Sequence, residues 1–295
     1  MPTKIPYNRE LDFEYGRVDA LTPLLRRVIA NNPSAFTFHG TGTYIVGHGQ
    51  VAIVDPGPDL AEHVDALLDA IRGETVSHIL VTHTHNDHSP AVKAVQAATG
   101  APTFAYGPHG TRPEDGASEG GADYDFAPDH VISDGDIVTG KGWSVEAVHT
   151  PGHCSNHLCF ALQEESTLLC GDHVMGWSTS IVSPPDGDMQ AYMASLEKVG
   201  RHASQRYFPT HGGPIDDPKP YVKALLAHRH EREDQILAEL ASGPATIAEM
   251  VPRMYADVDP KLYPAAARSV LAHLIHMVET ERVKAEGDVF RLVNG

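Results

Sequence analysis

The sequence predicts an α/β protein in which a mixed strand-and-helix region is followed by a smaller, mostly helical one. Two observations carry this prediction. Short β-rich runs alternate with amphipathic helical segments up to about residue 217, as in α/β folds. From residue 218 the pattern is helical and ends in a short hairpin. We therefore expect one domain over residues 1–217 and a second over residues 218–295.

The elements of the first domain follow from residue type and turn signals. Two β-rich runs joined by His-Gly-Gln predict a hairpin, and Gly73 is a typical C-cap for the next helix. Ser89 and Pro90 have the preferences of an N-cap and a first helical residue. Residues 107–130 lack an apolar period and are expected to form a long loop. In order, we expect strands over 43–47 and 51–55, a helix over 60–73, a strand over 78–82, a helix over 91–99, strands over 102–106, 143–150, 158–162 and 167–171, a helix over 188–203 and a strand over 206–210.

The second domain is expected to contain three helices and a terminal hairpin. A long helical run over 221–243 ends at Gly243-Pro244, which is a strong stop signal. Two further helices are expected over 246–255 and 264–283, followed by a hairpin that turns at 286–288. Three helices followed by a hairpin suggest a winged-helix module.

Composition excludes several functional classes. The net charge of −17 disfavours broad adhesion to nucleic acid or to anionic lipid. No window approaches 18 uninterrupted apolar residues, and the first residues lack the apolar core of a signal peptide. Three cysteines without Cys-x-x-Cys spacing are typical of a reducing compartment. We expect a cytoplasmic protein that binds neither DNA nor a membrane.

Four side chains of the metal-ligand type are crowded into one turn. His83, His85, Asp87 and His88 lie within six residues, between a predicted strand and a predicted helix. In α/β proteins, ligand-binding and catalytic residues commonly lie in such strand-to-helix turns. Imidazole and carboxylate at this density suit Zn²⁺, with Fe or Mn as alternatives. A chance group of histidines on a polar surface loop is the competing interpretation.

Three residues distant in the chain strengthen the metal interpretation. His153, Asp172 and His211 each follow a predicted strand. Strand ends meet at one edge of a sheet, so these side chains can converge on the crowded turn. Each alone would be unremarkable, but together they predict one metal centre.

The motifs H-x-H-x-D-H, T-P-G-H, G-D-H and T-H-G-G, in this order, resemble those of the metallo-β-lactamase-fold hydrolases over about residues 44–213. The segment A-H-R-H-E-R-E-D-Q-I-L and the helical tail resemble the lactamase-β-like protein 2 group. The resemblance implies an αββα sandwich with two metal ions, expected to be zinc, at one sheet edge. It implies that the first ion is held by His83, His85 and His153, the second by Asp87, His88 and His211, and that Asp172 bridges them, with Asp87 and Asp172 as catalytic residues.

Some neighbouring residues are candidates for supporting roles. Asp55 is expected to accept a hydrogen bond from a metal-binding histidine. His157 and Trp177 could line the site or could simply be packed. Arg229 and Arg232 lie in the long helix of the second domain, where they either contact an anionic substrate or form part of an ordinary solvated face.

Two metal ions can share a water and lower its pKa toward ~7, which supplies a metal-bound hydroxide for hydrolysis. Sequence motifs for a serine nucleophile or a nucleotide-binding loop are absent. We expect a small, anionic ester, thioester or lactone as substrate. Cleavage of single-stranded RNA is the alternative, although residues 221–295 contain nine Lys or Arg against eleven Asp or Glu and so form no basic face.

Two hypotheses belong to other classes. Some members of this fold are persulfide dioxygenases that use a single iron, and one iron per chain with thiol-linked oxygen uptake would indicate that activity. A winged-helix regulator without catalysis would instead bind DNA at physiological salt. The second domain is expected to cover the mouth of the site or to form a contact in a homo-oligomer.

Overall fold

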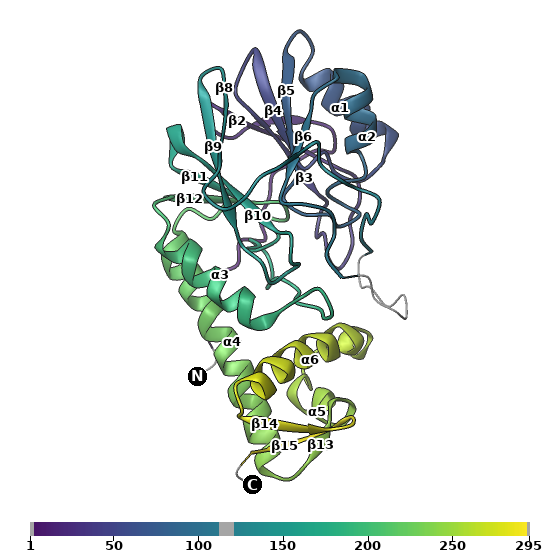
Figure 1. Ribbon diagram of the computed structural model, residues 1–295, viewed down its shortest axis with the longest axis vertical. Coiled ribbons are helices and arrows are strands. Elements are labelled where there is room, and N and C mark those ends of the chain that lie inside the picture. Colours follow the sequence, from purple (N-terminus) through teal and green to yellow (C-terminus); the bar gives the residue numbers. More distant parts are fainter. Residues whose placement is uncertain (1–2, 112–120, 294–295) are drawn as a thin grey trace.

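The computed structural model describes residues 3–111 and 121–293 (Figure 1). The part of the predicted 107–130 loop at residues 112–120 lies outside the described residues. Two β-sheets pack face to face, and helices cover the outer side of each (Figure 1). The αββα architecture expected from the resemblance is confirmed.

The first sheet has seven strands in the order of the chain. The predicted hairpin is present, and its turn uses Gly47 and Gly49, both in the left-handed region that favours glycine. Neighbouring strands are antiparallel from β1 to β4 and parallel from β4 to β7. The strands are β1 (Val18–Ala20), β2 (Leu25–Ile29), β3 (Gly42–Val46), β4 (Gln50–Val54), β5 (Thr75–Leu80), β6 (Thr103–Ala105) and β7 (His130–Val131).

The second sheet has five strands in the order β12-β11-β10-β9-β8. β11 and β12 are parallel, and the other neighbours are antiparallel. The inward-facing side chains of both sheets, including Tyr44, Trp143 and Phe160, form the core between them. The strands are β8 (Ile137–Gly140), β9 (Trp143–His149), β10 (Leu158–Leu162), β11 (Thr167–Gly171) and β12 (Arg206–Pro209), with a 3₁₀ turn at Gln163–Glu165 between β10 and β11.

Each sheet has its own pair of covering helices. Helices α1 (Ala61–Ala70) and α2 (Val92–Thr99) pack on the first sheet through Leu67 and Val95. Helices α3 (Met189–Arg201) and α4 (Pro218–Ala241) pack on the second sheet through Leu196 and Leu225.

The start of α2 differs from the prediction. Its N-cap is Ala91, and the helix begins at Val92. The hydroxyl of Ser89 donates to Asp123 instead of capping the helix. The predicted end is confirmed, because Gly100 has φ 71°.

The last part of the chain forms the expected winged-helix module (Figure 1). Its core contains Ile236 and Leu240 from the end of α4, so this helix is shared by two hydrophobic cores. The domain boundary at 217/218 therefore stays a proposal. The remaining elements are β13 (Ala245–Thr246), α5 (Ile247–Met254), a 3₁₀ turn at Pro260–Leu262, α6 (Tyr263–Glu279), β14 (Val283–Glu286) and β15 (Val289–Leu292).

Within the described residues, no helix is both long enough and apolar enough to cross a bilayer. The cytoplasmic location and the oligomeric state stay predictions.

Candidate metal centre

Both sheets contribute side chains to one site. The segment after β5 holds His83, His85, Asp87 and His88. On the second sheet, residues that follow β9, β11 and β12 complete the group, and they are His153, Asp172 and His211. All seven predicted ligands are therefore brought to one edge of the sandwich.

Three imidazoles form a first group. Nδ1 of His85 lies 3.0 Å from Nε2 of His83 and 2.9 Å from Nε2 of His153. Burial lowers the pKa of His85 to about 3, and it also lowers the pKa values of the other two. These rings are therefore neutral at pH 7, which is the form in which imidazole binds a metal.

A carboxylate and two imidazoles form a second group. Oδ2 of Asp87 lies 3.1 Å from Nε2 of His211 and 3.3 Å from Nε2 of His88. Although burial lowers the pKa of His211, the neighbouring Asp172 carboxylate raises it to about 10. This imidazole therefore carries a proton that a bound cation would displace.

Asp172 lies between the two groups. Its Oδ1 is 3.5 Å from Nε2 of His88 and 3.4 Å from Nε2 of His211. Its Oδ2 is 3.8 Å from Nε2 of His153. One carboxylate therefore presents an oxygen to each group.

The chemistry of these atoms fits metal ions. Among the described residues, Nε2 of His88 and Oδ1 of Asp172 are buried and lack a hydrogen-bond partner. Buried polar atoms are normally satisfied, so such atoms that converge on one point fit the binding of a cation. Imidazole nitrogen and carboxylate oxygen are the donors that zinc takes in catalytic sites.

The other ring nitrogen of several histidines is fixed by an oxygen. Nδ1 of His88 donates to Oδ2 of Asp55 over 2.9 Å. Nδ1 of His153 donates to the carbonyl of Ile181 over 2.6 Å, and Nδ1 of His211 to that of Gly40 over 3.2 Å. Such contacts orient metal-binding imidazoles and select their tautomer.

His157 lies behind the site. The backbone N–H of Asp172 donates to its Nε2 over 3.2 Å, so its Nδ1 is protonated and donates to Thr150 over 2.8 Å. Trp177 does not line the cavity described below. Its ring stacks on Phe38, with centroids 4.8 Å apart.

Arg229 fits neither version of its prediction, whereas Arg232 lies partly exposed on α4, outside the cavity. Arg229 is buried, donates to the carbonyl of Ser180 and lies 4.9 Å from the centre of the Tyr192 ring. Arg232 is half-buried over Tyr255. Neither arginine lines the cavity, because the face of α4 that carries Arg229 packs against the first domain.

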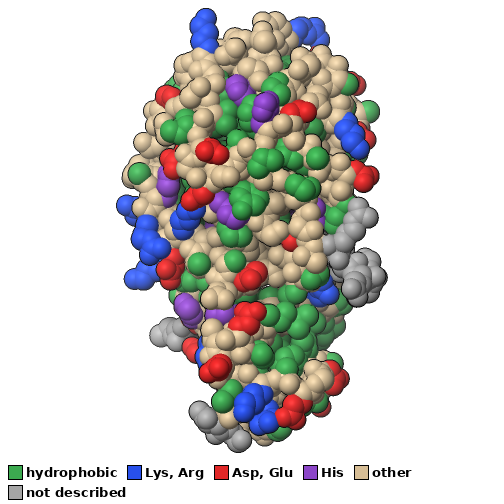
Figure 2. Space-filling view, viewed as in Figure 1, with side chains coloured by type: hydrophobic (Ala, Val, Ile, Leu, Met, Phe, Trp, Pro, Cys, Tyr) green, Lys and Arg blue, Asp and Glu red, His purple; other side chains and the backbone are tan. Residues whose placement is uncertain are grey.

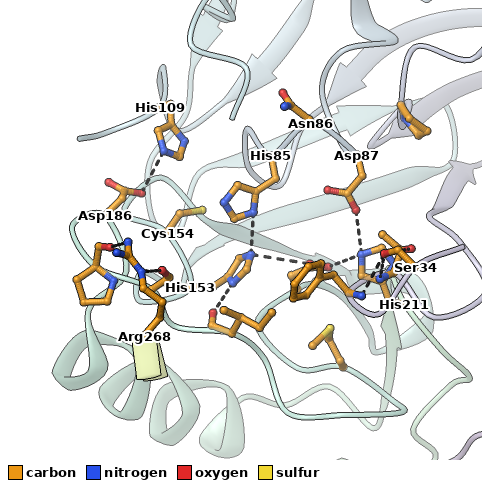
Figure 3. A pocket seen from close by; sticks show the side chains of 18 of the residues that line it. Ser34, His85, Asn86, Asp87, His109, His153, Cys154, Asp186, His211 and Arg268 are labelled. Atoms are coloured by element: carbon orange, nitrogen blue, oxygen red, sulfur yellow. Dashed lines mark hydrogen bonds and ion pairs between the residues drawn. The ribbon is translucent and has the colours of Figure 1, made fainter. Parts of the chain in front are cut away.

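A cavity of about 290 Å³ opens onto the metal groups (Figure 3). Its apolar lining includes Phe36, Met175, Ile181 and three prolines. The polar residues of its wall that sequence reasoning missed include His109, Asp186 and Arg268. No local motif marks them, because loop packing and the docking of α6 bring them to the cavity.

Cys154 also lines the cavity, next to the first group. Burial raises the pKa of its thiol well above the usual value. It therefore remains a thiol, which donates to Oδ1 of Asn156.

Comparison with known proteins agrees with this geometry. A model of the metallo-beta-lactamase superfamily matches residues 37–211, and a model of the beta-lactamase associated winged helix domain matches residues 246–291. A beta-lactamase-like protein 2 homolog from Drosophila melanogaster is 34% identical over 87% of this chain and 88% of its own. An atrochrysone carboxyl ACP thioesterase from Cryptosporiopsis sp. is 32% identical over 81% of this chain and 74% of its own.

A solved structure supports the fold along the whole chain. The beta-lactamase domain protein from Burkholderia ambifaria superposes with a TM-score of 0.79, covering 97% of both chains at 19% identity. Both family models thus match within this one chain. The chain belongs to the metallo-beta-lactamase superfamily, and it is a hydrolase of that family.

Proposed function

We propose that this hydrolase holds two zinc ions and cleaves a small thioester. The position of Asp172, with one carboxylate oxygen toward each group of ligands, carries the binuclear part of this proposal. His83, His85 and His153 would hold one ion, Asp87, His88 and His211 would hold the other, and Asp172 would touch both. When bound, such a pair of ions lowers the pKa of water and polarises a carbonyl oxygen.

The protein's own residues would orient and shelter the substrate. Apolar side chains such as Phe36 and Ile181 would exclude water from the acyl group. Asp87 and Asp172, whose pKa values lie well below the usual range despite the opposing effect of burial, stay ionised because buried histidines surround them. They are therefore ready to bind cations at neutral pH.

Two observations favour a small thioester over RNA. A relative that is 32% identical is named as an atrochrysone carboxyl ACP thioesterase. On the face of the molecule in Figure 2, acidic and basic side chains are interspersed over the winged-helix module, whereas a nucleic-acid reader normally shows a basic stripe.

Zinc-loaded protein tested on a thioester, a lactone, a β-lactam, a phosphodiester reporter and single-stranded RNA, with metal counted per chain, tests the proposal. We expect about two metal ions per chain and the highest kcat/KM on the thioester. Asp172→Ala should lose both ions and turnover, whereas His230→Ala, on the exposed side of α4, should keep them. Cleavage of RNA without thioester hydrolysis, or one iron per chain with thiol-dependent oxygen uptake, would overturn it.

A further inference from the structure

The winged-helix module contributes a positively charged side chain, Arg268, to the wall of the cavity. Arg268 belongs to α6, yet its side chain reaches the cavity that the first domain builds around the metal groups (Figure 3). Among the described residues that line this cavity, it is the one arginine or lysine.

Among the described residues, the charge of Arg268 has no ion-pair partner. Its Nε donates to the hydroxyl of Ser183 over 2.9 Å, and its Nη2 donates to the carbonyl of Pro184. Both acceptors are neutral. Within residues 3–111 and 121–293, no carboxylate lies within ion-pair distance of this guanidinium. These two contacts fix the arginine in place and leave further N–H groups unused.

Asp186, another charged residue of the same wall, is engaged elsewhere. Its carboxylate accepts hydrogen bonds from the backbone N–H groups of Thr111 and Ser155, over 3.0 and 2.9 Å, and from the Ser155 hydroxyl over 2.8 Å. Figure 3 shows it directed toward His109. Its pKa is lowered, because these hydrogen bonds outweigh the effect of burial. It therefore does not neutralise Arg268.

We propose that Arg268 is a specificity-determining residue that binds an oxyanion of the substrate, either a carboxylate of the acyl part or a phosphate of the thiol part. The proposal rests on the proposed thioester hydrolysis. A planar guanidinium donates two parallel hydrogen bonds to either oxyanion, and a partly apolar cavity strengthens that interaction. The winged-helix module would then select substrates for the metal site.

Two matched pairs of thioesters separate the sources of the oxyanion. Succinyl and butyryl esters of N-acetylcysteamine differ in an acyl carboxylate. Butyryl-4′-phosphopantetheine and butyryl-pantetheine differ in the phosphate of the thiol. For each pair, kcat/KM is measured for the wild type, Arg268→Ala, Arg268→Lys and Arg232→Ala, together with the metal content of each protein.

The wild type should prefer the anionic member of one pair. In Arg268→Ala this preference should fall about 10- to 100-fold, mainly through KM, which is the loss expected for a hydrogen bond to a charged group. Arg268→Lys should keep part of it, and Arg232→Ala should keep all of it, since Arg232 lies outside the cavity.

A purely structural role gives a different result. Arg268 also holds the segment next to Ile181, whose carbonyl positions His153. If that were its whole role, Arg268→Ala and Arg268→Lys would lower the rates of both members equally and leave the preference unchanged, which would overturn the proposal. A wild type without preference for either anionic member would overturn it as well. Absence of turnover on every thioester would instead refute the proposed function.

Discussion

Asp55 connects the end of β4 to the candidate metal centre. Its backbone has φ 50°, a conformation that Asn and Asp tolerate better than most residues. Its carboxylate accepts from the backbone N–H of Thr82 at Oδ1 and from the Thr82 hydroxyl and Nδ1 of His88 at Oδ2. One buried carboxylate thus fixes both the turn and a ligand of the second group.

Asp55→Asn should weaken one of the two metal sites. Asparagine accepts the same backbone conformation, but its amide N–H would face two donors, Nδ1 of His88 and the Thr82 hydroxyl. Loss of such a supporting contact typically lowers metal affinity about 10- to 100-fold. Competition with a chromophoric chelator measures the affinity of each site. Asp59→Asn, an exposed neighbour, is the control, and unchanged affinities in Asp55→Asn would contradict the role given to Asp55.

The candidate ligands could be predicted from the sequence, whereas the arginine of the cavity could not. His83 to His88 form a local motif, and His153, Asp172 and His211 each follow a strand, so that fold class alone suggests where they meet. Arg268 reaches the cavity only because α6 docks against the segment around Ser183. No spacing in the sequence encodes that contact, whereas Arg229 and Arg232 stand close together in a helix that periodicity predicts.

At the level of elements, α4 joins two hydrophobic cores. Its first half packs on the second sheet, and its last turns pack inside the winged-helix module. The helix and its Gly243-Pro244 end were predictable from periodicity and stop signals. The strand β2 is absent from the sequence-based prediction, because its sequence Leu-Arg-Arg-Val-Ile contains two arginines. One of them, Arg27, is nevertheless buried and pairs with Asp19. The ion pair with Asp19 allows Arg27 to be buried in the strand despite its charge.

Arg229→Ala should destabilise the protein instead of altering substrate binding. The substitution leaves the buried carbonyl of Ser180 without its donor and removes the contact with the Tyr192 ring. We expect the free energy of unfolding to fall by about 1–3 kcal/mol. Urea unfolding measures it. Arg232→Ala, on the same helix and half-buried, should cost less than about 1 kcal/mol, and equal losses in the two variants would argue against this assignment.

A buried polar cluster links α4, α6 and the hairpin of the module. Glu233 of α4 accepts from Nδ1 of His276 over 2.8 Å and from Arg282 over 2.6 Å. His273 of α6 lies beside it, with its Nδ1 3.5 Å from Oε1 of Glu233. Burial lowers the pKa of His273 to about 4, with Arg229 adding to this effect and Glu233 opposing it.

His273 should make the free energy of unfolding depend on pH. Because its folded pKa is depressed, the unfolded state binds the extra proton between pH 6.5 and 4. The free energy of unfolding should therefore fall as pH falls through this window, by up to about 1.4 kcal/mol per pH unit. Urea unfolding of the wild type and His273→Gln between pH 7.5 and 4.5 tests it. The wild type should lose stability relative to the variant below pH 6.5, and parallel curves would contradict the prediction.

For the whole molecule, the candidate metal centre joins the two halves of the sandwich. The segment after β5 brings four ligands from the first sheet, and the ends of β9, β11 and β12 bring three from the second. The charges of the half-buried Asp87 and the buried Asp172 outweigh the effect of burial and raise the pKa values of His88 and His211. Bound metal should therefore stabilise the packing of one sheet on the other.

Removing the metal should lower the stability of the whole fold. A ligand that binds only the folded state adds about 2.7 kcal/mol when its free concentration is 100 times its Kd, so two saturated sites have a large effect. Thermal unfolding is measured on zinc-loaded protein, after treatment with a chelator, and after zinc is restored. We expect Tm to fall on chelation and to recover with zinc. Asp172→Ala should respond little to either treatment, because its sites are already lost. If Tm stayed constant while metal analysis showed complete removal, the ligands would not join the sheets as proposed.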